Sequence, residues 1–327
     1  DQVKQRSHDS ERFSVSQSDL SALPLDEQEL RLQVLMAEES ARSFDLSADL
    51  MIRARLYRLS AQEYVLQVTM HHIASDGWSM KILVDEFRHF YAQSERTDKA
   101  AALSLQYADY AKWQRDWLQG DVLLRHQNYW QQQLSDLPTE HGLALDFPRP
   151  KKQSSNGGCY RDQIDVTTGD ALQALCRRHD ATLFMGLHTV FSVLLSRYSQ
   201  ELDIVVGSPV ANREQSEVAE LIGFFVNTLV LRSDLSGEPD FVSLLERNRR
   251  VLLDAYEHQQ MPFEQLVELL QPERSLSHSP LFQVMLILQN NDSAELSLPE
   301  VEVTTLEPLL NVAKYDLTLV VEESEQG

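Results

Sequence analysis

The stretch that decides the fold spans residues 52–78 and reads IRARLYRLSAQEYVLQVTMHHIASDGW. Residues 52–59 alternate apolar and charged side chains, which is the two-residue period of a half-buried strand. Residues 64–70 are mostly apolar, and only a short link separates them from the first strand, so a β-hairpin is predicted. Residues 79–93 then carry apolar side chains at helical spacing. The histidine segment 71–77 therefore lies between a strand and a helix, where rigid elements often hold functional loops.

The rest of the chain continues to alternate between helices and strands. Helices are predicted over 27–44, 107–134, 168–179, 182–198 and 241–256, and strands over 160–166, 203–210, 225–232 and 281–289. Residues 1–30 show no clear pattern. Breakers and small polar residues cluster over 145–158, which predicts a linker. The sequence thus predicts an α/β protein with an N-terminal lobe over 1–144 and a C-terminal lobe over 159–327.

Composition limits the class of protein. The chain has 327 residues, of which 43% are hydrophobic and 24% charged, enough for two lobes with sizeable cores. A formal charge of -21 disfavours nucleic acid and an anionic membrane surface as partners, because both attract basic surfaces. No apolar run approaches the ~18 residues of a membrane span, and the start has no apolar signal region, so a cytoplasmic protein is expected. For Cys159 and Cys176, reduced thiols are favoured over a disulfide or a zinc site.

His71 and His72 close the second strand of the predicted hairpin. If both remain in strand geometry, their side chains point to opposite faces and cannot serve the same site, so one histidine should face the packed interior and the other a cleft. A histidine in a cleft can accept and return a proton near neutral pH, since its ordinary pKa is ~6.5. Gly77 permits a tight turn, and a helix starting after it would aim backbone N–H groups at developing negative charge.

Asp76 is expected to organise this loop, by accepting backbone N–H bonds or by pairing with an arginine of the neighbouring strand. Arg53 and Arg55 are the candidates. Two other interpretations stay open on these residues alone. The histidine pair and the Asp-Gly turn can be purely structural. His72 and Asp76 can also share a metal ion if the segment is helical, although no third ligand stands at a convincing spacing.

Five stretches stand in a characteristic order along the chain. They are MHHIASDGWS (70–79), YADYAKWQR (107–115), IGFFVNT (222–228), HQQMPFE (258–264) and SPLFQV (279–284). Together they resemble the condensation domain of nonribosomal peptide synthetases over nearly the whole chain. Residues 77–80 are similar to the condensing branch of that family and not to the epimerising branch. Two motifs that precede the histidine signature in the family, and its final helices, are not found, so a domain truncated at both ends is expected.

The resemblance implies two chloramphenicol-acetyltransferase-like lobes, each a two-layer α+β sandwich, in a V with a central tunnel. It implies amide-bond formation between a donor acyl or peptidyl thioester and an acceptor aminoacyl thioester. Both substrates would arrive on the 4'-phosphopantetheine of carrier proteins, with no cofactor or metal bound by the chain itself. Donor and acceptor peptidyl carrier domains are the expected partners, with an adjoining adenylation domain in a longer chain and no nucleic acid or membrane partner.

The same resemblance implies roles for particular residues. His72, as a base or a positioning group, and Gly77, through its N–H, would act on the reacting atoms. The supporting residues would be His71, Asp76 paired with Arg53, Trp78 and Asn227. Asn227 and Thr228 would line the tunnel, link the lobes or cap a strand end. The other candidates are expected to have structural roles. Trp113 and Trp117 would be core aromatics, and His258 a structural histidine. Arg149, Lys151 and Lys152 would be solvated linker residues that could also contact an acidic carrier protein.

Three other functions stay open at this stage. A coenzyme A-dependent acyltransferase would share the histidine chemistry, but no clear basic cluster for the nucleotide is evident. A non-catalytic module would only dock carrier proteins. An epimerisation domain would act on the α-carbon, and it would invert a carrier-bound residue without any acceptor.

Overall fold

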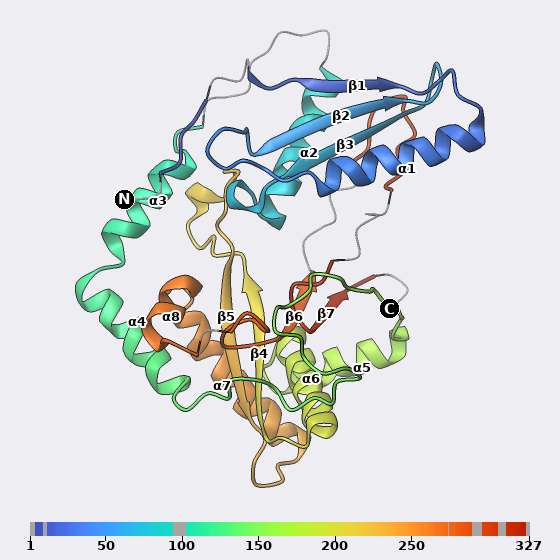
Figure 1. Cartoon of the computed structure of the whole chain (residues 1–327). Coiled ribbons are helices and arrows are strands. Elements are labelled where there is room, and N and C mark those ends of the chain that lie inside the picture. Colours follow the sequence, from blue (N-terminus) through green and yellow to red (C-terminus); the bar gives the residue numbers. More distant parts are fainter. Residues whose placement is uncertain are drawn as a thin grey trace. The chain divides into compact units, whose positions relative to one another are not determined.

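The computed structural model describes residues 4–8, 12–93, 103–273, 275–289, 296–306 and 312–324. Contacts divide the chain into two compact units, each built from several separate parts of the sequence (Figure 1). As far as these residues are described, unit 1 comprises 1–112, 213–225 and 293–310, and unit 2 comprises 113–212, 226–292 and 311–327.

These units differ from the predicted lobes. Residues 113–144 belong to unit 2, and the segment 145–158, predicted as a linker, lies wholly inside unit 2. Residues 213–225, in contrast, return to unit 1. Breakers mark where elements end along the chain, but they carry no information about which remote segment packs there, so this exchange could not be foreseen from them.

Unit 1 contains a three-stranded sheet in the order β1-β2-β3. The strands are β1 (Val15–Asp19), β2 (Ile52–Arg58) and β3 (Tyr64–Met70). β2 and β3 form the predicted antiparallel hairpin, whereas β1 pairs with β2 in parallel. The helix α1 (Leu25–Ala41) runs along this sheet (Figure 1), and its Leu35 shares a small apolar core with Tyr57 of β2. The two-residue period of β2 therefore places Tyr57, and the residues two and four positions before it, on the face that α1 covers.

A short 3₁₀ turn, η2 (His72–Ala74), connects β3 to α2 (Gly77–Ala92). The single helical run predicted farther along is divided into α3 (Tyr107–Trp117) and α4 (Gly120–Gln133). The division has a local cause, because Gly120 has a positive φ of 54°. Glycine adopts that conformation without the steric cost that other residues meet.

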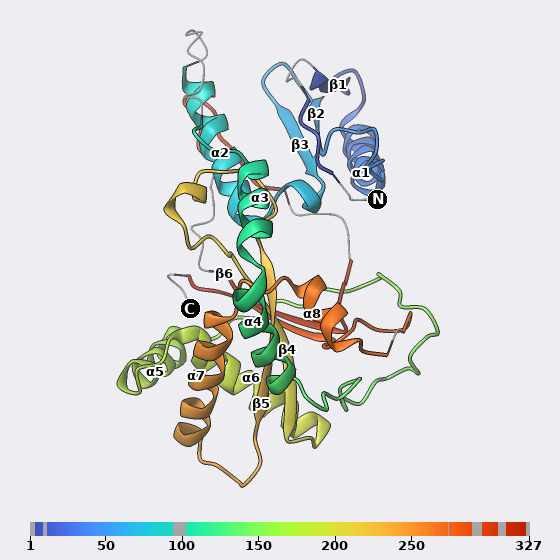
Figure 2. The ribbon, with the colours of Figure 1, turned by 90° about the vertical axis from the view of Figure 1, so that its left-hand side faces the viewer.

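Unit 2 contains a four-stranded sheet in the order β5-β4-β6-β7. The strands are β4 (Asp203–Val210), β5 (Asn227–Asp234), β6 (Val284–Gln289) and β7 (Leu317–Glu322). The helices besides α4 are α5 (Val166–Arg178), α6 (Leu183–Ser199), α7 (Phe241–Glu257) and α8 (Phe263–Leu270). α6 packs on β4 and α7 packs on β5 (Figure 2). Each unit thus combines helices with a sheet, and the predicted α/β class is confirmed.

The predicted strand over 160–166 is wrong. Residues 160–165 form no regular element, and α5 begins at Val166. Asp165 caps this helix, because its Oδ1 accepts the N–H of Thr168 at 3.0 Å. An aspartate just before a helical run is an ordinary N-cap signal, and here it marks the start of α5 at the end of the predicted strand.

One α-helix and two strands of the described residues were not predicted at all. β1 is five residues long and mostly polar, so its sequence has no strand period strong enough to detect. α8 has only eight residues, which is near the lower limit of a recognisable helix. β7 is six residues long and most of its residues are exposed. Short elements of this kind are defined by their neighbours in space more than by their own composition.

The structure adds three observations on composition. Within the described ranges, no helix combines the length and apolar character needed to cross a bilayer. Across the same residues, no group of three or more His, Cys, Asp or Glu side chains is placed to hold a metal ion. Cys159 is exposed and Cys176 is buried, and the structure joins neither of them in a disulfide bond.

Candidate active site

The chain turns sharply after β3. His71 is still extended, and its N–H donates to the carbonyl of Met51 at 2.9 Å. Its ring Nδ1 accepts the N–H of Ile73 at 3.0 Å, so His71 caps the η2 turn. His72 thus lies in a 3₁₀ turn and not in a strand. The two histidines therefore do not both lie in strand geometry, and capping of η2 directs the His71 ring.

His72 is exposed, and one of its ring nitrogens is held by its own turn. Nδ1 lies 2.6 Å from the carbonyl oxygen of Ser75. A carbonyl oxygen can only accept, so Nδ1 carries the proton and donates it. The neutral ring then has its lone pair on Nε2, which is the tautomer that can take a proton from a substrate.

Asp76 is the centre of the loop and is only 4% exposed. It caps α2, with Oδ1 accepting the N–H of Ser79 at 2.8 Å and the Ser79 hydroxyl at 2.7 Å. Its Oδ2 accepts the N–H of Phe225 at 3.0 Å. Arg213 completes the set, with Nη2 at 3.1 Å from Oδ1 and 3.3 Å from Oδ2. Asp76 is therefore an organiser, as predicted, but its cationic partner is Arg213.

The predicted pairing of Asp76 with Arg53 is wrong. Arg53 Nε lies 2.6 Å from Glu39 Oε1 of α1, and Nη2 donates to the carbonyl of Arg42 at 2.8 Å. Arg55 bonds the hydroxyl of Ser18 through Nε and Nη2. The physical reason is the alternation of side chains along β2, which places both arginines on the face that α1 covers.

Arg213 is buried with its partner, and the two side chains are 2% and 3% exposed. Its Nη1 donates to the carbonyls of Val218 and Leu221 at 2.6 and 2.8 Å. The guanidinium carbon also lies 3.9 Å from the ring centroid of Phe225. Burial lowers the pKa of Arg213, and the charge of Asp76 opposes that shift. These bonds satisfy a charge that would otherwise be costly to bury.

Residues 213–225 contact the histidine loop at further points. They include the second 3₁₀ turn, η3 (Ser216–Val218). The Trp78 indole N–H donates to the carbonyl of Ala219 at 2.9 Å. The N–H of Gly223 donates to the Ser79 hydroxyl at 3.1 Å. Trp78, predicted as a supporting residue, is thereby a link between α2 and this segment.

Gly77 is the first residue of α2 and is exposed. Its φ is not positive, and a Cβ placed there would meet no atom within 4 Å. The turn itself therefore does not require glycine at this position. The predicted role, in which open space lets a substrate approach the first N–H groups of α2, stays a prediction.

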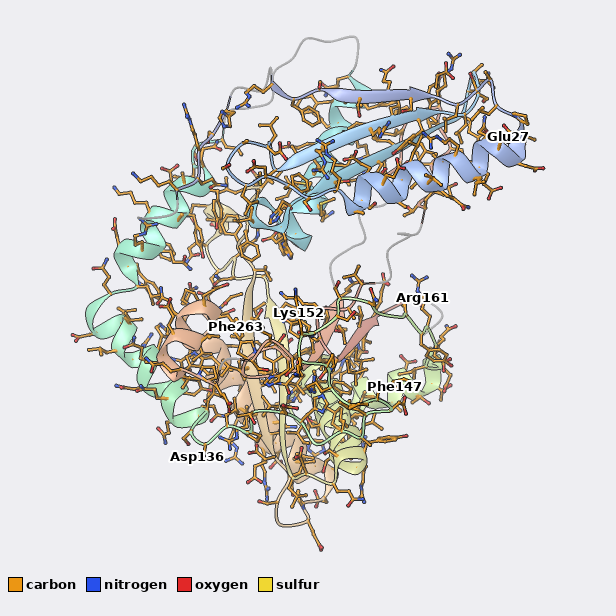
Figure 3. The ribbon with its side chains drawn as sticks, viewed as in Figure 1. Glu27, Asp136, Phe147, Lys152, Arg161 and Phe263 are labelled. Carbon is orange, nitrogen blue, oxygen red and sulfur yellow. The ribbon has the colours of Figure 1, made fainter. Side chains whose placement is uncertain are left out.

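Asn227 has a full set of partners inside unit 2. Its Nδ2 donates to the carbonyls of Gln259 and Met261, each at 2.7 Å, and its Oδ1 accepts the N–H of Phe263 at 3.0 Å. These bonds join β5 to the start of α8, where Phe263 is labelled in Figure 3. A part in the reaction for Asn227 or its neighbour Thr228 stays a prediction.

His258 is part of a buried aromatic cluster in unit 2. Its Nδ1 lies 2.9 Å from Nδ1 of His126, and the Tyr129 ring stacks on it at 4.1 Å. Burial, and then the charge of Arg125, lowers the pKa of His258. These contacts fit the structural role expected for His258.

In the same unit the rings of Trp113 and Trp117 of α3 stack with their centroids 5.5 Å apart. Trp113 is 38% exposed, so it is not the core aromatic that was predicted.

Arg149 is not a solvated linker residue. Its Nη2 lies 2.7 Å from Asp316 Oδ2 and its Nε 2.9 Å from Glu140 Oε2, with 13% of the side chain exposed. Lys151 and Lys152 are exposed as expected, and Lys152 is labelled in Figure 3. The segment 145–158 is therefore tied to unit 2 by its arginine, which the breaker residues around it did not indicate.

Comparisons with known proteins agree with the resemblance carried by the five stretches. The chain matches the family model described as "Condensation domain" over residues 1–327. A linear gramicidin synthase protein of Brevibacillus parabrevis is 45% identical over 316 residues, which cover 94% of this chain and 6% of that protein. Malpinin synthetase of Mortierella alpina is 44% identical over 303 residues, which cover 92% of this chain and 4% of that protein. The chain thus spans only a small part of the length of these relatives.

Solved structures are also similar. The X-domain from teicoplanin biosynthesis is 27% identical, with a TM-score of 0.84, and the match covers 96% of this chain and 70% of that one. The complex of the X-domain and OxyB from teicoplanin biosynthesis gives 28% identity and a TM-score of 0.82 over 96% of this chain and 68% of that one. The family match over the whole length confirms the resemblance, and this chain belongs to the condensation-domain family of nonribosomal peptide synthetases.

Proposed function

We propose that this chain catalyses formation of an amide bond between two thioester substrates presented by carrier proteins. The observation that carries the proposal is the bond from His72 Nδ1 to the Ser75 carbonyl at 2.6 Å, because it leaves Nε2 of an exposed ring free to accept a proton. The family membership supports the substrate class. The partners we propose are a donor and an acceptor peptidyl carrier domain, beside an adenylation domain in a longer cytoplasmic chain.

The chemistry needs one base and one site for negative charge. The acceptor amine attacks the donor carbonyl, so a C–N bond forms and the carbonyl oxygen gains negative charge. His72 Nε2 takes the proton that the amine nitrogen releases. The C–S bond then breaks, and the proton passes to the sulfur of the donor phosphopantetheine arm. The imidazole ends the cycle in its starting tautomer, so no cofactor is required.

The start of α2 suits the developing oxyanion. The first N–H groups of a helix have no partner within the helix, and the helix dipole adds positive potential there. Gly77 occupies this position and leaves the space beside it open. An N–H at this place would stabilise the oxyanion in the way of other oxyanion holes, where loss of one donor costs about 10²–10³-fold in rate.

A single-turnover assay tests the proposal. Donor and acceptor groups are loaded on their carrier proteins, and the amide product is followed by mass. His72→Ala should lower the rate by roughly 10²–10⁴-fold, the effect of a positioned acid–base group. His71→Ala is the matched control, because its ring caps η2 and packs against Phe44, and a smaller loss is expected. A His72→Ala protein that turns over at the parent's rate contradicts the proposal.

A second candidate function has one observation in its favour. A similar solved structure is a complex of the X-domain with OxyB, so a protein with this fold can bind a protein partner. We propose docking without catalysis as the alternative. Docking without catalysis predicts that the parent and His72→Ala both bind loaded carriers and that neither forms amide product. The same assay excludes a coenzyme A-dependent transferase if free acyl-coenzyme A gives no product, and an epimerisation domain if the donor keeps its configuration when no acceptor is present.

A further inference from the structure

Phe224 and Phe225 are adjacent in the stretch 222–228, but their rings have different surroundings. Phe225 is buried with Tyr110 in a small core of unit 1, and its N–H donates to Asp76. Phe224 is half-buried, and its ring faces that of His72. The two ring centroids are 5.1 Å apart and the planes make an angle of 72°. This is the edge-to-face geometry that aromatic rings prefer.

We propose that Phe224 is a positioning residue, which holds the His72 ring so that Nε2 keeps a fixed direction toward the substrate amine. The inference rests on the proposed function and deepens it. The bond from Nδ1 to the Ser75 carbonyl fixes the tautomer, but a ring held at one atom can still tilt about that bond. A second contact, made by another part of the chain, limits this tilt. Precise direction matters, because a small misplacement of a reacting group can lower the rate about 10²-fold.

Phe224 can serve this purpose because its own backbone is held on both sides. The Tyr107 hydroxyl donates to the Phe224 carbonyl at 2.9 Å. Burial, and then the charge of Asp76, raises the pKa of Tyr107, so the hydroxyl stays protonated and remains a donor. The preceding N–H, of Gly223, is bonded to Ser79, and the following N–H is bonded to Asp76. Both acceptors belong to the loop and helix that carry His72, so the two rings are fixed to one framework.

The size of the effect follows from the contact. An edge-to-face aromatic pair contributes about as much as a 2- to 12-fold change in an equilibrium. Loss of the Phe224 ring should therefore lower the rate of amide formation by about this factor. The KM for the acceptor should change less, since Phe224 acts on His72 and not on the carrier. A ring that merely fills space would instead change stability and leave the histidine as it was.

The experiment reads the histidine directly. The 327-residue chain is labelled with ¹⁵N-histidine, and two-bond ¹H–¹⁵N spectra report which ring nitrogen carries the proton. The His72 signals are assigned by their loss in His72→Ala. The parent should show a protonated Nδ1 in one sharp set of signals. Phe224→Leu should broaden or shift this set, and Phe224→Tyr, which keeps the ring, should restore it. Phe147→Leu is the control, because Phe147 is 82% exposed and projects outward in Figure 3.

Each result decides the inference. The inference is overturned if the His72 signals of Phe224→Leu match those of the parent. It is also overturned if Phe147→Leu shifts or broadens the His72 signals as much as Phe224→Leu does. If Phe224→Leu fails to fold, Tyr107→Phe removes only the hydroxyl that holds the Phe224 carbonyl, and a smaller change in the same direction is required. An amide assay in which the parent is inactive overturns the proposed function, whereas the positioning of His72 is judged on the spectra alone.

Discussion

Replacing Arg213 by methionine removes the charge that balances Asp76 while keeping much of the apolar volume of the side chain. Arg213 Nη2 lies 3.1 Å from Asp76 Oδ1, and the two side chains are 2% and 3% exposed. Removal of one partner of a buried ion pair costs about 3–5 kcal/mol, because the other charge stays buried and unbalanced. Ser79 and Phe225 would still donate to the carboxylate, so we expect a loss near the lower end, about 3 kcal/mol.

Amide hydrogen exchange measures this loss at the loop itself. The N–H of Phe225 donates to Asp76 and the N–H of Gly223 donates to Ser79, so both report on the junction. A loss of about 3 kcal/mol in local stability should speed their exchange by roughly 10²-fold. Arg53→Met is the matched control, since that arginine pairs with Glu39 and should leave both amides unchanged.

Two outcomes would contradict this role of the Arg213–Asp76 ion pair. Exchange of the Phe225 amide in Arg213→Met within about twofold of the parent would mean that the ion pair does not hold this segment. Equal acceleration in Arg53→Met would mean that any loss of a cation in unit 1 loosens the loop. The double variant with Asp76→Asn and Arg213→Met should lose less stability than the two single variants lose together, because neither charge is then left buried without its partner.

Two further changes test other parts of the structure. His188 is fully buried, neither ring nitrogen has a partner among the described residues, and burial lowers its pKa to about 4. In the unfolded chain this histidine binds a proton with a pKa of ~6.5, whereas in the folded chain it stays neutral down to a pH of about 4. Stability that is present above pH 6.5 is therefore lost as the pH falls toward 4. His188→Leu should reduce this slope by about 1.4 kcal/mol per pH unit in urea unfolding at pH 5 to 6, and an unchanged slope would reject the assignment. In Gly223→Ala, the new Cβ would meet the ring of Tyr107, so a loss of about 1–3 kcal/mol is expected. Gly158→Ala, with no atom within 4 Å of the new Cβ, is its control, and equal losses in the two thermal melts would contradict the clash.

The elements that were predicted best are those that depend on short-range patterns. β3 and β4 begin and end at the residues expected, 64–70 and 203–210, because an apolar run between turns is read from neighbouring residues alone. The strand predicted at 160–166 is wrong, because its apolar residues follow no strict two-residue period and Asp165 caps a helix that begins at Val166.

The site was only partly predictable. His72, Asp76 and Gly77 are brought together by their closeness in sequence, so the motif located the loop. Arg213 is 137 residues from Asp76, and no pattern in the chain connects the two. The alternation of side chains along β2 could nevertheless have excluded Arg53 as the partner of Asp76. It shares a face of β2 with Tyr57, and a strand face that carries a large aromatic side chain is the one expected to be covered.

The distance in sequence has a consequence for variants of this chain. The tautomer of His72 depends on its own turn, but the direction of its ring and the position of the loop depend on residues 213–225. A chain with an intact His-His-x-x-x-Asp-Gly segment that has lost Arg213 should therefore lose activity although every residue of the motif is present. In contrast, a chain that keeps this remote segment but lacks His72 should keep the bonds of Asp76, while it loses the bond to the Ser75 carbonyl and the proposed base. Exchange at the Phe225 amide separates these two ways of becoming inactive, since only the first accelerates it.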